Sequence, residues 1–453
     1  MNFLDRNYTK QTVKLALPVM LTQLGQVSVQ LFDNIIVGNL LGANALAAVS
    51  LGNALFFSVF VFGLGISFAI PPLVSEAHSQ NKHDRINSVF RHGFVLNMAV
   101  GLLLMILLLA FRPLLYHLDQ PKEIIPDTEI YLTVMAFSIL PFMTFQTLRE
   151  VSEGLGYTIG VTKATIFANV INIALNYVFI KGMFGFPPMG VKGSAIATLI
   201  ARIFMLAFLY FVMVNHQTTK RYVKDFSLKI GLFTKRMFTK MLKLGLPTAL
   251  QMFFEVTAFA GAAFICGMIS AKDIASHQIA LSMASFTFNL CIGFSVASTV
   301  MIGRKLGQRD FVELRKVGVN NIKIAFIFMV LCGTFFILAR NTLPTFFTKK
   351  EDVEVIQLAS KLLIIASLFQ LSDGIQVTAL GILRGIQDVK IPSYLTFFAY
   401  WIITIPLGFY LCVTLKMGAF GMWIALGLGL TISAVLLVYR FLKLSGKRIK
   451  ANT

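Results

Sequence analysis

The sequence predicts an all-α polytopic membrane protein with twelve transmembrane helices, built as two six-helix lobes related by a pseudo-two-fold axis along the membrane normal. Three observations predict this fold: an apolar composition, a series of long apolar stretches, and an internal repeat. Of the 453 residues, 57% are hydrophobic and only 13% are charged. A soluble globular chain carries about twice that share of charged residues.

The apolar stretches recur along the whole chain and leave no room for a separate soluble domain. Each has about 20 residues or more, which lets a helix cross a hydrocarbon core of about 30 Å. The predicted spans are residues 13–40, 45–74, 88–111, 128–150, 162–185, 190–214, 240–268, 275–303, 317–340, 355–383, 392–414 and 418–442.

Lys and Arg residues are distributed unevenly over the connections between these spans. Connections on the side of the N-terminus carry 29 of them, and those on the opposite side carry nine. Because cytoplasmic connections are enriched in Lys and Arg, both termini are predicted to be cytoplasmic, in the cytoplasmic (inner) membrane. The same bias accounts for the net charge of +20. We therefore expect a lipid bilayer, and no nucleic acid, as a partner.

The two halves of the chain repeat each other at an offset of about 228 residues. Three pairs of segments match in the same order: KLALP at 14–18 with KLGLP at 243–247, GISFA at 65–69 with GFSVA at 293–297, and GVKGSAIA at 190–197 with GAFGMWIA at 418–425. An even number of helices per half implies parallel repeats with a cavity between them. The predicted parts are an N-lobe, a cytoplasmic linker and a C-lobe, at residues 1–214, 215–240 and 241–453.

Polar residues form stripes at helical spacing on three predicted spans. The stripes are Gln23, Gln26, Gln30 and Asp33 in the first span, Asn169, Asn172 and Asn176 in the fifth, and Gln278, Ser282, Ser285 and Asn289 in the eighth. Residues three or four apart share one helix face, so none of these faces suits lipid. For single Gln and Asn residues, hydrogen bonds between helices remain an alternative to a wet cavity.

Acidic residues inside spans give a sharper signal. Only Asp33, Glu255 and Asp373 lie well inside predicted spans, while the other acids lie in connections or at helix ends. Carboxylates within a membrane are costly and mark ion pathways or binding sites. The alternative is that they pair with the two intramembrane bases, Arg202 and Lys361. A desolvated carboxylate takes up a proton readily, and oxygens from Asp, Asn and Thr suit a hard cation such as sodium.

Motifs for other chemistry are missing from the sequence. There is no Walker A sequence, no zinc-type cluster of His and Cys, no Gly-x-Ser-x-Gly and no dinucleotide fingerprint. We therefore expect no enzymatic activity and no cofactor. His277 and the four cysteines, Cys266, Cys291, Cys332 and Cys412, are interpreted as residues of helix packing.

With its twelve spans and its 6+6 repeat, the chain resembles the multidrug and toxic compound extrusion (MATE) family, and more narrowly its NorM-like branch. The segments that carry the resemblance are LPVMLTQLGQ (17–26), DNIIVGN (33–39), LPTALQMFFEV (246–256), ASHQIA (275–280) and SDGIQVTALGILRGIQD (372–388). Members of this family are antiporters that expel organic, often cationic, drugs in exchange for sodium ions or protons.

The resemblance implies two coupling sites. Asp33, Asn172, Asn176 and Thr198 would form an N-lobe cation site, and Glu255 with Asp373 would form a C-lobe site, so sodium is expected at Asp33 or at the Glu255 and Asp373 pair. Some relatives carry an acid at the position of Asn176, and its absence here favours the C-lobe pair.

The expected substrates are small amphipathic organic cations, carried by a monomer. Adaptable apolar and polar side chains would line the substrate cavity, namely Gln26, Gln30, Gln251, Phe254, Gln278, Met283 and Gln370. Two alternatives stay open. A flippase for a lipid-linked sugar precursor would need several basic residues inside, and a passive channel would need charged rings or a filter motif.

Overall fold

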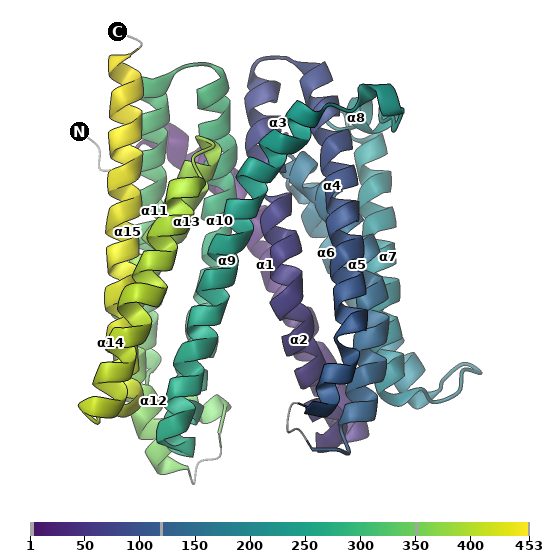
Figure 1. The fold of residues 1–453 in the computed structure, drawn as a ribbon, viewed down its shortest axis with the longest axis vertical. Helices are drawn as coiled ribbons and strands as arrows, with labels where there is room; N and C mark the ends of the chain where they lie inside the picture. The colour runs from purple at the N-terminus through teal and green to yellow at the C-terminus, as the bar shows by residue number, and fades with distance from the viewer. Residues whose placement is uncertain (1–3, 118–120, 349–351, 452–453) are drawn as a thin grey trace. The chain divides into compact units, whose positions relative to one another are not determined.

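The computed structural model describes residues 4–117, 121–348 and 352–451. Within these residues the regular structure is helical, and twelve helical segments are long and apolar enough to cross a membrane. Six of these segments lie in each half of the chain, as predicted. The fold is therefore that of an all-α polytopic membrane protein (Figure 1).

The first half of the chain contains nine helical segments within the described residues. Its helices are α1 (Arg6–Leu41), α2 (Ala43–Ser67), α3 (Ile70–Ser79), α4 (His83–Ala110), η1 (Arg112–His117), α5 (Ile125–Gly154), α6 (Ile159–Lys181), α7 (Gly190–Asn215) and the short α8 (Lys220–Lys224). The second span is divided between α2 and α3 because Pro71 and Pro72 occupy the first turn of α3, where proline is tolerated.

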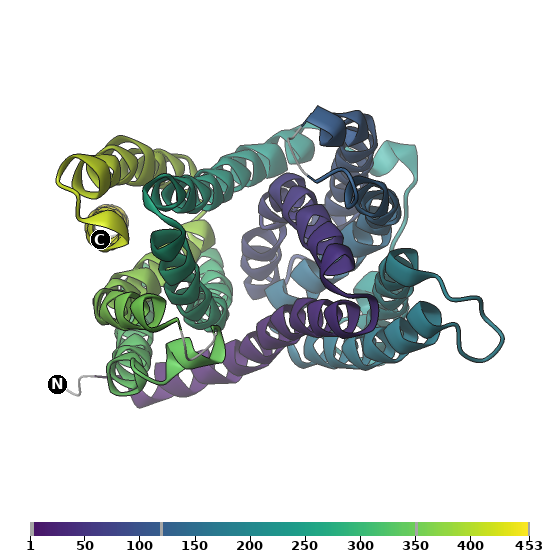
Figure 2. The same ribbon diagram turned by 90° about the horizontal axis from the view of Figure 1, so that it is seen from below.

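The second half follows the same plan after the short η2 (Ile230–Leu232). Its helices are α9 (Lys235–Ile269), α10 (Ala271–Gly307), α11 (Phe311–Ala339), η3 (Leu343–Phe346), α12 (Val353–Gly385), α13 (Lys390–Phe397), η4 (Phe398–Thr404), α14 (Ile405–Phe409), η5 (Tyr410–Thr414) and α15 (Gly418–Lys450). Helices α10, α12 and α15 pack side by side, as Figure 2 shows from below. Segments α13 to η5 form one continuous span, in which η4 and η5 are π-helical.

The chain divides into two compact units, residues 21–249 and residues 1–20 with 250–453. The divisions fall inside α1 and α9, two or three residues after Pro18 and Pro247, which interrupt the hydrogen bonding of those helices. The beginning of each helix therefore packs with the other half of the chain. The lobe boundaries predicted at residues 214 and 241 describe the sequence repeat, and they stay a prediction. The compact units have other boundaries, at residues 20–21 and 249–250.

Matched glycines allow these exchanged helix starts to pack closely. A Cβ at Gly65 would clash with the backbone of Ala249, and a Cβ at Gly293 would lie 2.6 Å from Cγ of Met20, the residue that matches Ala249. Since Gly65 and Gly293 are equivalent in the repeat, the same contact occurs once in each unit. Thr12 adds a hydrogen bond of 2.7 Å to Asn321 Oδ1. The repeated sequence thus builds a repeated packing.

Candidate functional site

Asp33 lies on α1, buried within the first half of the chain. Its side chain is 4% exposed. The amide Nδ2 of Asn176 on α6 donates to Asp33 Oδ1 at 2.7 Å, and the hydroxyl of Thr198 on α7 lies 3.4 Å from Oδ2. Asn172 donates to Thr198 Oγ1 at 3.3 Å. The structure therefore brings together the four residues of the predicted N-lobe cation site. That they bind a cation stays a prediction.

An oxygen acceptor beside Asp33 has no partner among the described residues. Asn176 Oδ1 is buried and accepts no hydrogen bond from them, although its Nδ2 donates to Asp33 and to Asn172. A buried acceptor without a donor costs about 1–3 kcal/mol. A cation bound by Asp33 would remove this cost by taking Asn176 Oδ1 as a further ligand. The third asparagine of the stripe, Asn169, instead packs helices together by donating to the carbonyl of Gly25 at 2.8 Å.

Arg202 on α7 is a half-buried base near this site. Its guanidinium donates to Ser138 Oγ at 2.6 Å and lies over the rings of Phe56 and Phe142 at 4.9 and 5.0 Å. Such cation–π contacts stabilise an arginine out of water. Among the described residues Arg202 forms no ion pair, and neither does the exposed Lys361. The alternative in which these two bases pair with the intramembrane acids is therefore wrong in this structure.

Glu255 on α9 is held by neutral donors within the second half. Gln251 and Gln376 donate to its two carboxyl oxygens at 3.3 and 3.2 Å. The hydroxyl of Tyr400 lies 3.4 Å from Glu255 Oε1 and 3.2 Å from Gln376 Oε1. No basic side chain forms an ion pair with Glu255 in the described part of the chain.

Asp373 on α12 is the second acid of this half. It is 3% exposed and lies one turn before Gln376, close enough to Glu255 for the two carboxylates to repel each other. Over the described ranges it forms no ion pair either. Two carboxylates close to each other attract a cation, because a shared positive charge removes their repulsion.

Two of these residues were missed in the sequence. Gln376 continues the spacing of Gln370 and Asp373 by three residues, so a longer search along that face would have found it. Tyr400 gives no such signal, because it lies in the π-helical segment η4, which changes the direction of side chains along the span. Trp401 of the same segment donates to the carbonyl of Phe254 at 3.1 Å.

The predicted substrate residues occupy diverse surroundings. Gln30 and Gln278 are exposed, Phe254 and Met283 are half-buried, and Gln251 is buried against Glu255. Gln26 at Nε2, and Gln370 at both atoms of its amide, have buried polar atoms that bond to no other residue in the described ranges. In the eighth-span stripe, Ser282 and Asn289 bond to carbonyls of their own helix. The substrate cavity itself stays a prediction.

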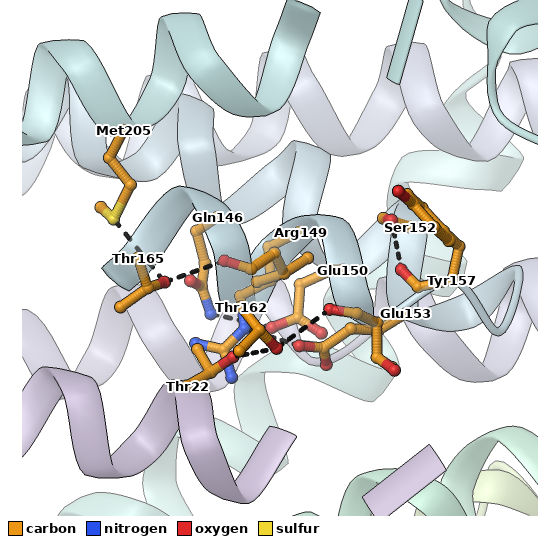
Figure 3. Close-up of polar contacts among 12 residues, drawn as sticks. Thr22, Gln146, Arg149, Glu150, Ser152, Glu153, Tyr157, Thr162, Thr165 and Met205 are labelled. Atoms are coloured by element: carbon orange, nitrogen blue, oxygen red, sulfur yellow. Dashed lines mark hydrogen bonds and ion pairs between the residues drawn. The ribbon is translucent and has the colours of Figure 1, made fainter. Parts of the chain in front are cut away.

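A second buried polar cluster lies on α5 of the first half, outside the predicted sites (Figure 3). Arg149, Glu150 and Glu153 are 4%, 0% and 0% exposed. From the sequence they are residues of a helix end, and nothing in their spacing distinguishes a solvated end from a buried one.

Comparison with known proteins identifies the relatives of this chain. The model of the MatE family matches residues 18–178 and 247–410. A probable multidrug resistance protein NorM of Agrobacterium fabrum is 34% identical over 451 residues, covering 98% of this chain and 96% of that protein. Multidrug resistance protein MdtK of Yersinia pseudotuberculosis is 31% identical, with coverages of 95% and 94%.

Solved structures share the fold. One described as the outward-facing conformation of a multidrug resistance MATE family transporter has a TM-score of 0.89 at 21% identity and covers 98% of this chain and 97% of that one. A eukaryotic MATE transporter has a TM-score of 0.87 at 19% identity, with coverages of 99% and 99%.

Proposed function

Because this chain belongs to the MATE family, as a NorM-like member, we propose that it is a secondary active antiporter exporting amphipathic organic cations in exchange for sodium ions or protons. It is an integral membrane transporter and not an enzyme. The names of its relatives, multidrug resistance proteins NorM and MdtK, support efflux of several drugs.

One observation carries the coupling part of the proposal. Asp33, Glu255 and Asp373 are membrane-embedded acids, and none forms an ion pair within the described residues. The donors that bond to Asp33 and Glu255 are neutral amides and hydroxyls. A buried carboxylate without an ion-paired base is costly, and binding of one cation offsets that cost. Acids held in this way suit a site that is loaded and emptied in each transport cycle.

Coupling needs more than binding. The cation and the drug must each favour a different conformation, because a ligand with equal affinity for both states shifts neither. Neutralising Glu255 changes the charge at a junction of three elements, since α9, α12 and η4 all meet its carboxyl group. A change of one unit of charge at low dielectric constant is enough to alter how such elements pack. We propose alternating access driven in this way, by a monomer.

The proposal also assigns an orientation. The excess of Lys and Arg on the side of the N-terminus favours cytoplasmic N- and C-termini in the inner membrane. A reporter that is active only in the cytoplasm, fused after residue 453, tests this orientation. An active reporter is the expected result.

Transport into everted membrane vesicles tests the function itself. A fluorescent organic cation should accumulate when a sodium or a proton gradient is imposed, and each gradient is imposed separately. The variant with Glu255→Gln and Asp373→Asn should lose this driven uptake. Glu354→Gln is the matched control, because Glu354 is an exposed acid of the same half that pairs with Lys272 at 3.1 Å. Driven uptake that persists in the double variant would contradict the proposed coupling, and transport of a lipid instead of the dye would favour a flippase.

A further inference from the structure

The connection between the two repeats carries an exposed apolar tip, although a loop in water is usually polar. In the segment SLKIGLF (227–233), the side chains of Leu228, Ile230 and Leu232 are 47%, 90% and 41% exposed. These three residues come at alternate positions around the short η2. The amide of Leu232 donates to the carbonyl of Lys229 at 3.0 Å, so the tip is a tight turn. Exposed apolar side chains gathered in this way mark a contact with a partner or with lipid.

Both ends of this tip are fixed to α4. Before the tip, the ring of Phe226 packs against the rings of Phe90 and Phe94, with centroids 4.7 and 5.4 Å apart. After the tip, the backbone amide of Thr234 donates to Nε2 of His92 at 2.9 Å. The chain therefore leaves α4 and returns to it within about one turn of that helix, which holds the tip at one level along α4.

This level coincides with the predicted start of the third span. Helix α4 begins at His83, and the predicted span begins at residue 88. With a rise of about 1.5 Å per residue, Phe90 and Phe94 lie about 3 and 9 Å inside that start. The headgroup region on each side of a bilayer is about 5–8 Å thick. The tip is therefore held close to the depth where headgroups meet acyl chains, and apolar side chains are stable there.

The basic residues around the tip have no acids to pair with. Between Asp225 and Glu255 the sequence contains no acidic residue. Lys229, Lys235 and Arg236 are exposed, and none of them forms an ion pair within the parts of the chain that the structure describes. Headgroups with a net negative charge complement such a surface, whereas zwitterionic headgroups offer it no net charge.

We propose that residues 226–236 form an interfacial anchor that binds anionic phospholipids. The apolar tip lies among the upper parts of the acyl chains, and the three bases lie at the phosphate groups. Long basic side chains suit this place, because their stems are apolar and their charged ends reach the headgroups. The anchor ties the linker between the repeats to the surface of the bilayer. Only the assignment to the cytoplasmic leaflet rests on the proposed orientation of the chain.

Fluorescence quenching in lipid nanodiscs tests the anchor in the full-length protein. A fluorescent apolar amino acid replaces Ile230, and lipids brominated near the top of their acyl chains are the quencher. The fraction of phosphatidylglycerol, an anionic lipid, is varied against phosphatidylcholine. We expect quenching to rise with the phosphatidylglycerol fraction. The same probe at Lys82, an exposed residue just before α4, should be quenched little, because it lies about 12 Å further out than Phe90.

Charge variants separate binding of anionic lipid from mere closeness to the bilayer. The double variant Lys229→Gln with Lys235→Gln should need about a fivefold higher phosphatidylglycerol fraction, or more, for the same quenching, because each base near an anionic surface contributes about fivefold to binding. The matched control, Lys443→Gln with Lys447→Gln, removes two exposed bases from α15 and should leave the quenching unchanged. All four side chains are exposed, so the fold should tolerate each change.

Three outcomes would overturn the proposal. Lipid quenching at residue 230 that is no greater than at Lys82 would place the tip in water. Protection of the probe at residue 230 from both brominated lipid and aqueous iodide would mean that a protein partner or a second copy covers it. Equal quenching in phosphatidylcholine alone, or in the double variant, would remove the anionic lipid. The readout involves no transport, so failure of the antiport assay and failure of this proposal are separate results.

Discussion

The two halves of this chain share a sequence repeat and a packing pattern, but their interiors carry different charges. In the second half, Glu255 and Asp373 lie near each other without an ion-paired base among the described residues. In the first half, Asp33 has the half-buried base Arg202 in its surroundings, held by Ser138 and two phenylalanine rings. The second half thus carries two acids close to each other, and the first half carries one acid at the corresponding depth.

This difference separates what the repeat conserves from what it changes. The matched glycines Gly65 and Gly293 make the same contact in each unit, because packing depends on backbone approach. The acids do not match between the halves, because Asp33 has no acidic counterpart on α9. On these grounds we expect the second half to bind the coupling cation more tightly. The predictions below test this expectation.

The largest effect is expected from Glu255→Gln. Hydrogen bonds to a charged group contribute about 1.5–3 kcal/mol each, and every 1.4 kcal/mol is about tenfold in an equilibrium constant. We therefore expect a loss of about tenfold or more in the initial rate of ion-driven efflux from proteoliposomes. The exposed Glu354→Gln serves as the control. An unchanged rate would remove Glu255 from the coupling mechanism.

Asp33→Asn should have a smaller effect than Glu255→Gln. The nearby Arg202 already offsets part of the Asp33 charge, so the first half attracts a cation less strongly, and a loss of about threefold to tenfold is expected. The same efflux assay measures it, with the exposed Asp225→Asn as a control outside the spans. If Asp33→Asn proves more damaging than Glu255→Gln, the two halves have the opposite ranking.

Arg202→Gln should strengthen cation binding in the first half. Removing this positive charge takes away a repulsion that acts on a cation at Asp33, and a gain of about threefold is expected at an effective dielectric constant near 20. The measurement is sodium and proton binding in a background with Glu255→Gln and Asp373→Asn, where only the first half responds. A loss of binding would mean that Arg202 holds the site together instead of opposing the cation.

Tyr400→Phe should have the smallest effect. It removes one neutral hydroxyl, at 3.4 Å from Glu255, and leaves the two glutamine donors in place. A long hydrogen bond of this kind contributes about 0.5–1 kcal/mol, which corresponds to about a twofold to fivefold change in cation affinity. The cation concentration for half-maximal efflux measures the change. A loss as large as that of Glu255→Gln would show that the hydroxyl is essential to the site.

Much of this fold could be predicted from the sequence. Hydrophobic length predicted twelve spans correctly, and helical spacing placed Asp33 on the face of α1 that meets Asn176. The interruption after Ser67 and the π-helical segments of the eleventh span were not predicted, because local pairing of backbone groups decides them and hydropathy does not report it.

The buried polar residues of α5, Arg149, Glu150 and Glu153, show why part of the interior escaped prediction. Glu150 and Glu153 come at the end of a predicted span, where acids are usually solvated. Their burial results from the packing of α5 against other helices, including the contact of Gly154 with Val74 on α3. A single sequence contains no direct signal of that contact. Tyr400 was missed for a related reason, because the direction of its side chain depends on the π-helical geometry of η4.

Equilibrium binding of radioactive sodium and uptake of protons by the purified protein test the central claim most directly. The measurement compares three proteins, namely the wild type, Asp33→Asn, and the double variant Glu255→Gln with Asp373→Asn. We predict that the double variant loses the tighter class of cation binding and that Asp33→Asn retains it. Loss of the tighter class in Asp33→Asn, with its retention in the double variant, would contradict the account.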